Sequence, residues 1–329
     1  MIVLLLGGEG RFCNFIVNLF DIKEYYRMKL TSSHISDPYY GSMPIYTATC
    51  DAVNAALKDA LSSQESLAGN FLGRAFVALC DTFTGLIATF TTNISKFHKK
   101  LKRSELNEFV QSNRMKVNVV CNQLKMATND VKVYAPAGMN VTYCEAIDTL
   151  SLIYTQLNAV ETARTMLTAL QEIFNQLSSG DKSASKNIAS ASNYIGTIVR
   201  GSKEAVLKCQ KDFGSDRSDT VVWHKVYPAL TDIGRSVNKL LAMESRLQDV
   251  HTLVQMAENM EAVVKGILGL VKDKKLDDIP VNTRDLNNIG ETAKSVALIF
   301  DSYSLAATRQ MSLEHNTVLN INALFKAMS

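Results

Sequence analysis

Residues 143–178 read YCEAIDTLSLIYTQLNAVETARTMLTALQEIFNQLS, and their pattern is the clearest indication of the fold class. Its larger apolar residues recur every three or four positions, which is the period of one face of an α-helix and not the alternation of a β-strand. The spacing therefore predicts one uninterrupted amphipathic helix. The apolar series is Ile147, Leu150, Tyr154, Leu157, Val160, Ala163, Leu167, Leu170, Phe174 and Leu177.

The two ends of this stretch carry matching signals. Thr142 and Glu145 have the spacing of a capping box, in which the threonine oxygen accepts a free backbone amide and the glutamate reaches back to the cap. At the other end, Gly180 follows two serines and can take the left-handed conformation that closes a helix. We therefore expect the helix to begin at Tyr143 and to end near Ser178.

The same period recurs in three other stretches, at about 65–98, 229–272 and 283–308. The five prolines leave the ranges 45–135 and 137–227 free of this residue, so long helices are permitted there. The residues that form these apolar faces are Leu72, Phe76, Leu79, Phe83, Leu86, Phe90, Ile94 and Phe97; Leu230, Ile233, Val237, Leu240, Leu253, Met256, Met260, Val263, Ile267 and Leu270; and Leu286, Ile289, Ala293, Val296, Phe300, Tyr303 and Ala307.

Together these stretches predict an all-α protein, an elongated bundle of about seven or eight long amphipathic helices. We expect a partly irregular N-terminal segment and loop at 1–44. A first helical region at 45–214 and a second at 215–329 follow, the second packed on the first. Asp212 to Asp216 indicates the break between the two helical regions.

Composition argues against several classes of function. The 35 basic and 32 acidic residues leave a net charge of +3, whereas proteins that grip nucleic acid usually carry a clear basic excess. The six cysteines are far apart and form no CxxC or Cys/His cluster, so we expect no zinc site and no cofactor. Free cysteines favour a reducing compartment, and we expect the protein to be cytoplasmic or built into a virion assembled in the cytoplasm.

No catalytic motif stands out. Gly7-Gly8-Glu9-Gly10 follows an apolar run, but Cys13 stands where a dinucleotide fingerprint needs its third glycine. The five histidines lack partners at metal-ligand spacing. We therefore expect no catalytic, cofactor or metal residue and no enzymatic activity. An enzyme whose site is assembled across the fold stays open as a third hypothesis.

The densest basic cluster comprises Lys96, Lys99, Lys100, Lys102 and Arg103. Cations at the C-terminal end of a helix complement its dipole, which explains the cluster as a solvated helix end. The same charges could contact an anionic partner, namely the acidic face of a protein, lipid or nucleic acid. Both interpretations stay open.

A membrane-associated protein is the main alternative function. The phenylalanines of the 65–103 region could insert into a lipid bilayer beside that basic end, and Gly69, Gly73 and Gly85 would allow close helix approach. Against this, the uncharged run Thr82 to Ser95 is too short to span a bilayer. The apolar run Met1 to Leu6 is too short for the core of a signal peptide.

The polar segments near the two ends resemble those of helical virion and tail-associated structural proteins of large tailed bacteriophages. The residues that carry this resemblance are Met28 to Ser33, Ser36 to Gly41 and Asn320 to Lys326. It is a similarity of sequence style, so it assigns no residue a role. It implies a repeated subunit of a virion. Our leading hypothesis is a non-enzymatic structural protein that acts through helix–helix contacts with other subunits, in a homo- or hetero-oligomer.

Overall fold

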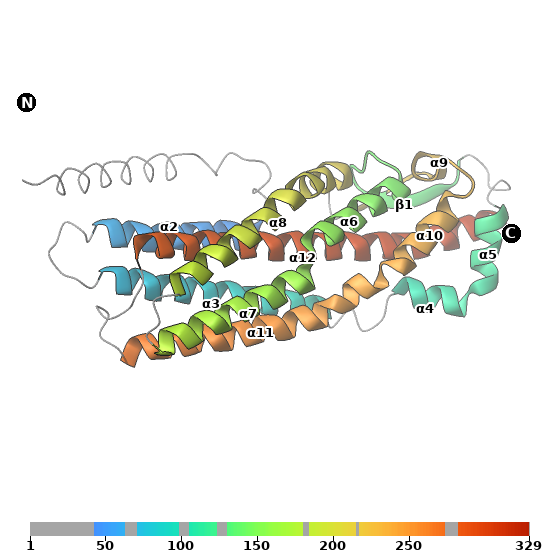
Figure 1. Cartoon of the computed structure of the whole chain (residues 1–329). Coiled ribbons are helices and arrows are strands. Elements are labelled where there is room, and N and C mark those ends of the chain that lie inside the picture. Colours follow the sequence, from blue (N-terminus) through green and yellow to red (C-terminus); the bar gives the residue numbers. More distant parts are fainter. Residues whose placement is uncertain are drawn as a thin grey trace, which may run out of the picture. The chain divides into compact units, whose positions relative to one another are not determined.

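The computed structural model describes residues 43–62, 71–98, 105–123, 130–179, 184–214, 217–273 and 282–328. Residues Met43–Ser329 form one compact unit. Its helices are α2 (Pro44–Ser62), α3 (Phe71–His98), α4 (Glu105–Ser112), α5 (Arg114–Gln123), α6 (Tyr143–Leu157), α7 (Ala159–Ser179), α8 (Ala184–Phe213), α9 (Trp223–Val226), α10 (Asp232–Ala242), α11 (Glu244–Asp273) and α12 (Thr283–Met328). The prediction of an all-α fold is confirmed (Figure 1).

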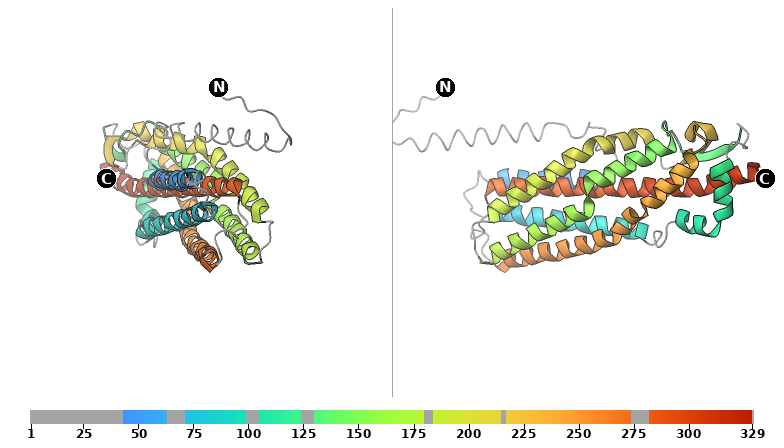
Figure 2. Two further views of the ribbon diagram at one scale, coloured as in Figure 1. Left: turned by 90° about the vertical axis from the view of Figure 1, so that its left-hand side faces the viewer. Right: turned by 45° about the vertical axis from the view of Figure 1, so that its right-hand side comes forward.

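The unit is built around α12. This helix has 46 residues and so extends for about 69 Å at 1.5 Å per residue. Helices α2, α3, α6 and α8 all pack against it, and the end-on view shows neighbours on several of its sides (Figure 2). Between Asp285 and Phe325, only His315 has an exposed side chain. A helix covered along its whole length is the core of the bundle, not one of its faces.

The apolar face expected on the 65–98 stretch is confirmed where the structure describes it. Phe76, Leu79, Phe83, Leu86 and Phe90 of α3 are all buried. Helix α3 packs against α2, α11 and α12. The ring of Phe90 stacks on the ring of Phe300 of α12, with centroids 3.7 Å apart. Gly85 on the same helix has no atom near the position of a Cβ, so close packing does not explain this glycine.

The helix expected across 143–178 is two helices, and the prediction of one uninterrupted helix was wrong. The capping box at Thr142 and Glu145 forms as expected. At Asn158, however, the chain takes a left-handed conformation with φ of 39°, which ends α6 and starts α7. Asparagine tolerates this conformation better than other residues with a side chain. The break rotates the second half, so that Met166 and Ile173 are buried while Leu170 is only half-buried.

The 229–272 stretch is also divided. Helix α10 ends at Ala242, and α11 begins at Glu244, after Met243. Leu230 precedes α10 and its side chain is 48% exposed, so it does not belong to the apolar face predicted for it. Helices α6 and α7 run beside α10 and α11, and both pairs bend along the bundle (Figure 1). The helix expected at 283–308 continues to Met328.

A short antiparallel sheet was not predicted. Strand β1 (Lys132–Pro136) pairs with β2 (Ser218–Val222), with Tyr134 opposite Thr220. The predicted boundary at 214 falls between α8 and β2, inside the compact unit. Two glycines with positive φ meet there: a Cβ on Gly214 would lie 2.4 Å from the carbonyl oxygen of Ala137 and 2.9 Å from the Cα of Gly138.

Candidate functional site: the buried polar residues of α12

Helix α12 buries an unusual number of polar side chains for a central helix. Buried polar groups are costly unless they form hydrogen bonds, so the partners of these side chains show what they do. Several of these partners are backbone groups at the ends or edges of neighbouring elements. The buried polar residues of α12 are Asp285, Asp301, Ser302, Arg309, Gln310, Glu314, Asn316, Thr317 and Asn320.

Asp301 lies against the beginning of α2. One of its carboxylate oxygens accepts a hydrogen bond of 2.8 Å from the backbone amide of Tyr46. The first amides of a helix have no partner within the helix, and their positive end favours an anion. Burial nevertheless raises the pKa of Asp301 to about 7, although the backbone amides of Tyr46 and Ile45 lower it. Asp301 therefore fixes the start of α2 with a carboxyl group that titrates near neutral pH.

Two residues of α12 serve the break between α10 and α11. The hydroxyl of Tyr303 donates to the carbonyl oxygen of Arg246, and the side-chain amide of Gln310 donates to the carbonyl oxygen of Met243 at 3.2 Å. The same amide also donates to Glu314 at 3.0 Å. Both carbonyl oxygens lie at the break, and that of Met243 also accepts from the backbone amide of Arg246 at 2.9 Å. Helix α12 thus adds side-chain donors to the backbone at the break.

Arg309 contacts the end of α8. Its guanidinium lies over the ring of Phe213, 5.7 Å from the centroid, and one of its nitrogen atoms donates to the carbonyl oxygen of Gly214 at 3.4 Å. A cation at the C-terminal end of a helix is favoured by the helix dipole. Gly214, with its left-handed φ, is the residue at which the chain leaves α8 for β2.

The sheet is attached to α12 through two asparagines. The side chain of Asn320 accepts from the backbone amide of Tyr134 at 2.6 Å and donates to the carbonyl oxygen of the same residue at 2.9 Å. It thereby pairs with β1 as a neighbouring strand would. Its amide also donates to the hydroxyl of Tyr227 at 3.1 Å. On β2, Ser218 donates to the side chain of Asn316 at 2.9 Å.

These contacts fix the position of α12 along its axis. A shift by one turn, about 5.4 Å, would separate each of these side chains from its backbone partner at the same time. Buried polar contacts that are mutually consistent specify one packing arrangement, because every alternative leaves buried groups unpaired. The polar residues of α12 therefore hold the start of α2, the end of α8, the α10–α11 break and the sheet in one register.

A polar crevice of about 220 Å³ lies between α6 and the α10–α11 break. Asp148, Lys239 and Arg246 line it, and the Lys239 amine lies 2.6 and 2.7 Å from the two carboxylate oxygens of Asp148. These are the convergent titratable groups that an enzyme hypothesis would use. Asp148 and Lys239 contact each other and join α6 to α10, which is the geometry of an interhelical ion pair, whereas Arg246 pairs with Asp249 of its own helix.

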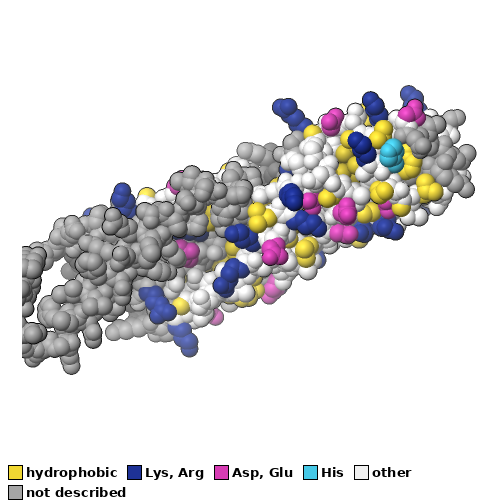
Figure 3. Space-filling model, turned by 90° about the horizontal axis from the view of Figure 1, so that it is seen from above, with side chains coloured by type: hydrophobic (Ala, Val, Ile, Leu, Met, Phe, Trp, Pro, Cys, Tyr) yellow, Lys and Arg dark blue, Asp and Glu magenta, His cyan; other side chains and the backbone are white. Residues whose placement is uncertain are grey.

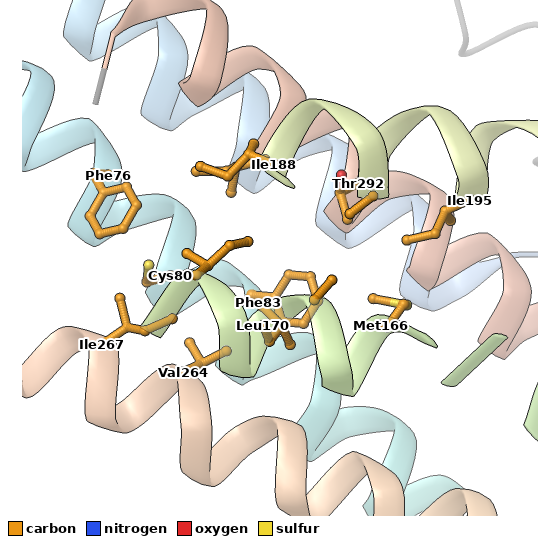
Figure 4. A pocket seen from close by; sticks show the side chains of 14 residues that line it. Phe76, Cys80, Phe83, Met166, Leu170, Ile188, Ile195, Val264, Ile267 and Thr292 are labelled. Atoms are coloured by element: carbon orange, nitrogen blue, oxygen red, sulfur yellow. The ribbon is translucent and has the colours of Figure 1, made fainter. Parts of the chain in front are cut away.

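A second hollow is apolar. It has a volume of about 60 Å³ and is lined by side chains of α3, α7, α8, α11 and α12 (Figure 4). The two lining residues with polar atoms are Cys80 and Thr292. Burial raises the pKa of the Cys80 thiol to about 12, and the hydroxyl of Thr292 donates to the carbonyl oxygen of Asn288 within its own helix. The lining therefore offers a ligand no free charge.

The basic cluster predicted to contact an anionic partner lies outside the described side chains. Lys96 belongs to α3, but its side chain lies outside the described residues, as do Lys99, Lys100, Lys102 and Arg103 altogether. On the face seen in Figure 3, the described basic and acidic side chains are interspersed. Among the described residues, no group of three or more His, Cys, Asp or Glu is placed to hold a metal ion.

Comparisons with protein families, with curated proteins and with solved structures found no match for this chain.

Proposed function

We propose that this chain is a non-enzymatic structural subunit that assembles with other protein subunits through the outer faces of its long helices. The observation that carries the proposal is the set of buried polar contacts from α12 to α2, α8, α10, α11 and both strands. They join elements that are far apart in sequence into one body, with a central helix about 69 Å long. A body of this kind transmits position and load along its length.

The outer helices support the same proposal. Helices α3, α8 and α11 contain 28, 30 and 30 residues, so each offers a lateral face of about 40 Å or more to a neighbour. Gly196 and Gly201 on α8 and Gly269 on α11 have no atom near the position of a Cβ. Small residues on such faces allow the backbone of a partner helix to approach closely.

The resemblance to helical virion and tail-associated proteins of tailed bacteriophages extends this proposal to a repeated subunit of a virion. Such a subunit would be made in the cytoplasm and would need a partner of defined geometry. Purification of the assembled particle, followed by mass spectrometry of its proteins, tests this extension. Recovery of the chain in fixed proportion to other virion proteins would support it, and recovery only in the soluble fraction would contradict it.

The assembly itself is tested by light scattering coupled to size exclusion, together with small-angle X-ray scattering, over a range of protein concentrations. A large defined oligomer, or an extended particle that polymerises, supports the proposal. A monomer of about 36 kDa at every concentration argues against self-assembly. The proposal would then require that this chain binds a different protein subunit. Failure to find such a subunit would contradict the proposal.

Association with a membrane is the second candidate, and one observation favours it. Gly73–Asn93 of α3 is long and apolar enough to cross a bilayer, but core helices of soluble proteins meet the same criterion. In the bundle, α3 packs against α2, α11 and α12, so insertion requires α3 to leave these neighbours. Co-sedimentation with phosphatidylserine vesicles tests this function. Absence of binding, or binding that persists in a Lys99→Glu/Lys100→Glu variant, would count against the predicted basic contact.

A further inference from the structure

The lining of the apolar hollow, termed the slot, extends along the helix axes. On three helices the first and last lining residues lie seven positions apart, namely Phe76 and Phe83 on α3, Met166 and Ile173 on α7, and Ile188 and Ile195 on α8. Seven residues of an α-helix rise by about 10 Å. A small apolar space of about 60 Å³ with a lining of this length suits a thin, extended ligand.

Water is a poor occupant of this slot. The volume would hold several water molecules, since each needs about 10–15 Å³ of this kind of space, but a buried water also needs two or more polar partners. Cys80 and Thr292 supply the only polar atoms of the lining, and the Thr292 hydroxyl is engaged by its own helix. Cavities lined in this way stay dry and take up apolar molecules.

The slot has a closed floor and a more open rim. Phe76, Ile195 and Val264 are at most 2% exposed, whereas Leu170 of α7, Ala191 of α8 and Thr292 of α12 are half-buried. Figure 4 shows the labelled side chains of the surrounding helices facing this common space. At the rim, the small side chain of Ala191 leaves room, and the polar end of a bound molecule would lie there in water.

We propose that this slot binds one straight alkyl chain, such as the hydrocarbon end of a single-chain amphiphile, with the polar head at the rim. The length of its lining, about 10 Å, matches roughly eight carbons of an extended zigzag, which advances by about 1.3 Å per C–C bond, so a straight chain is expected to fit better than a compact ring. The absence of a free charge in the lining excludes the head group from the floor. This binding site is independent of the assembly role and does not require it.

The test is isothermal titration calorimetry of the full chain with n-alkanols from butanol to dodecanol. Each added methylene is expected to tighten binding about fourfold, the equivalent of burying one CH₂, until the slot is full at roughly eight carbons. Cyclohexanol is expected to bind more weakly than n-hexanol, although both have six carbons. A dissociation constant that does not change with chain length, or equal binding of the compact and straight alcohols, would overturn the proposal.

Two variants on α8 sharpen the test. Ala191→Leu places a side chain in the slot and is expected to weaken octanol binding at least tenfold. Ala189→Leu makes the same change two residues away, at a half-buried position outside the lining, and should bind as the wild type does. Equal binding by both variants would contradict the assigned site. If Ala191→Leu does not fold, the comparison of n-hexanol with cyclohexanol on the wild-type protein still tests the proposal.

A separate experiment with phosphatidylcholine vesicles distinguishes the possible sources of the bound alkyl chain. Co-sedimentation that Ala191→Leu abolishes and Ala189→Leu preserves would identify a membrane lipid as the source. Binding of n-alkanols without co-sedimentation would identify a free amphiphile. Absence of binding in both arms would overturn the proposal.

Discussion

The carboxyl group of Asp301 makes the stability of this protein depend on pH in an unusual direction. Most aspartates of folded proteins have a lowered pKa, and their contribution is lost in acid. Asp301 is 5% exposed, and burial raises its pKa from 3.8 to about 7. The folded state therefore holds this proton up to neutral pH, whereas the unfolded chain releases it near pH 4.

The sign and size of the effect follow from proton linkage. The raised pKa contributes stability that is fully present below pH 4 and is lost as the pH rises through 7. Between pH 5 and pH 8, the contribution of Asp301 to the free energy of unfolding is expected to fall by about 2.5 kcal/mol. Asp301→Asn keeps an oxygen acceptor for the Tyr46 amide and cannot ionise, so it should lack this dependence.

Urea unfolding followed by circular dichroism at pH 5, 6, 7 and 8 measures this difference. The stability of Asp301→Asn relative to the wild type should rise steadily with pH over this range. Asp51→Asn is the control, because it makes the same chemical change at an exposed residue of α2, and its profile should follow the wild type. Parallel curves for the wild type and Asp301→Asn would contradict a raised pKa, because Asp301 would then have the same protonation in the folded and the unfolded state.

Three further substitutions test individual contacts by urea unfolding. Asn320→Ala removes the partner of both backbone groups of Tyr134 and should lower the free energy of unfolding by about 1–3 kcal/mol. Asn322→Ala, at a half-buried site, is the control and should lower it by less than about 1 kcal/mol. Equal losses of stability would contradict the role of Asn320. Gly214→Ala should lower the free energy of unfolding by at least about 2 kcal/mol, because φ is 61° and the new Cβ would meet the Ala137 carbonyl. An unchanged stability would contradict the left-handed conformation of Gly214 and its close approach to Ala137. Gly85→Ala adds a methyl group in open space and should stabilise α3 by up to about 1 kcal/mol; destabilisation would indicate a neighbour at that position.

Local sequence patterns were enough to predict the fold class and several helix ends. The apolar face of α3 and the capping box at Thr142 depend on residues within a few positions of one another, and both form as predicted. The break at Asn158 could not be foreseen from the periodicity, because the apolar series continues through it. A single left-handed residue is permitted by asparagine but not required by it.

The structural role of α12 was missed because its signal is not periodic. The apolar series that predicts a helix at 283–308 gives way to polar residues such as Gln310, Asn316 and Asn320, which usually indicate a solvated surface. They are buried here because their partners come from Met243, Ser218 and Tyr134, each far away in sequence. Long-range pairing of the same kind forms β1 and β2, each only five residues long.

Buried polar contacts from α12 join the surrounding elements into one rigid unit. Native-state hydrogen exchange of the full chain, measured across urea concentrations below the unfolding transition, tests it most directly. We predict that the amides of β1, of α10 and of residues 295–321 exchange with one common free energy, equal to that of global unfolding. Exchange from β1 or α10 at a free energy several kcal/mol lower than that of α12 would contradict the claim, because those elements would then open independently.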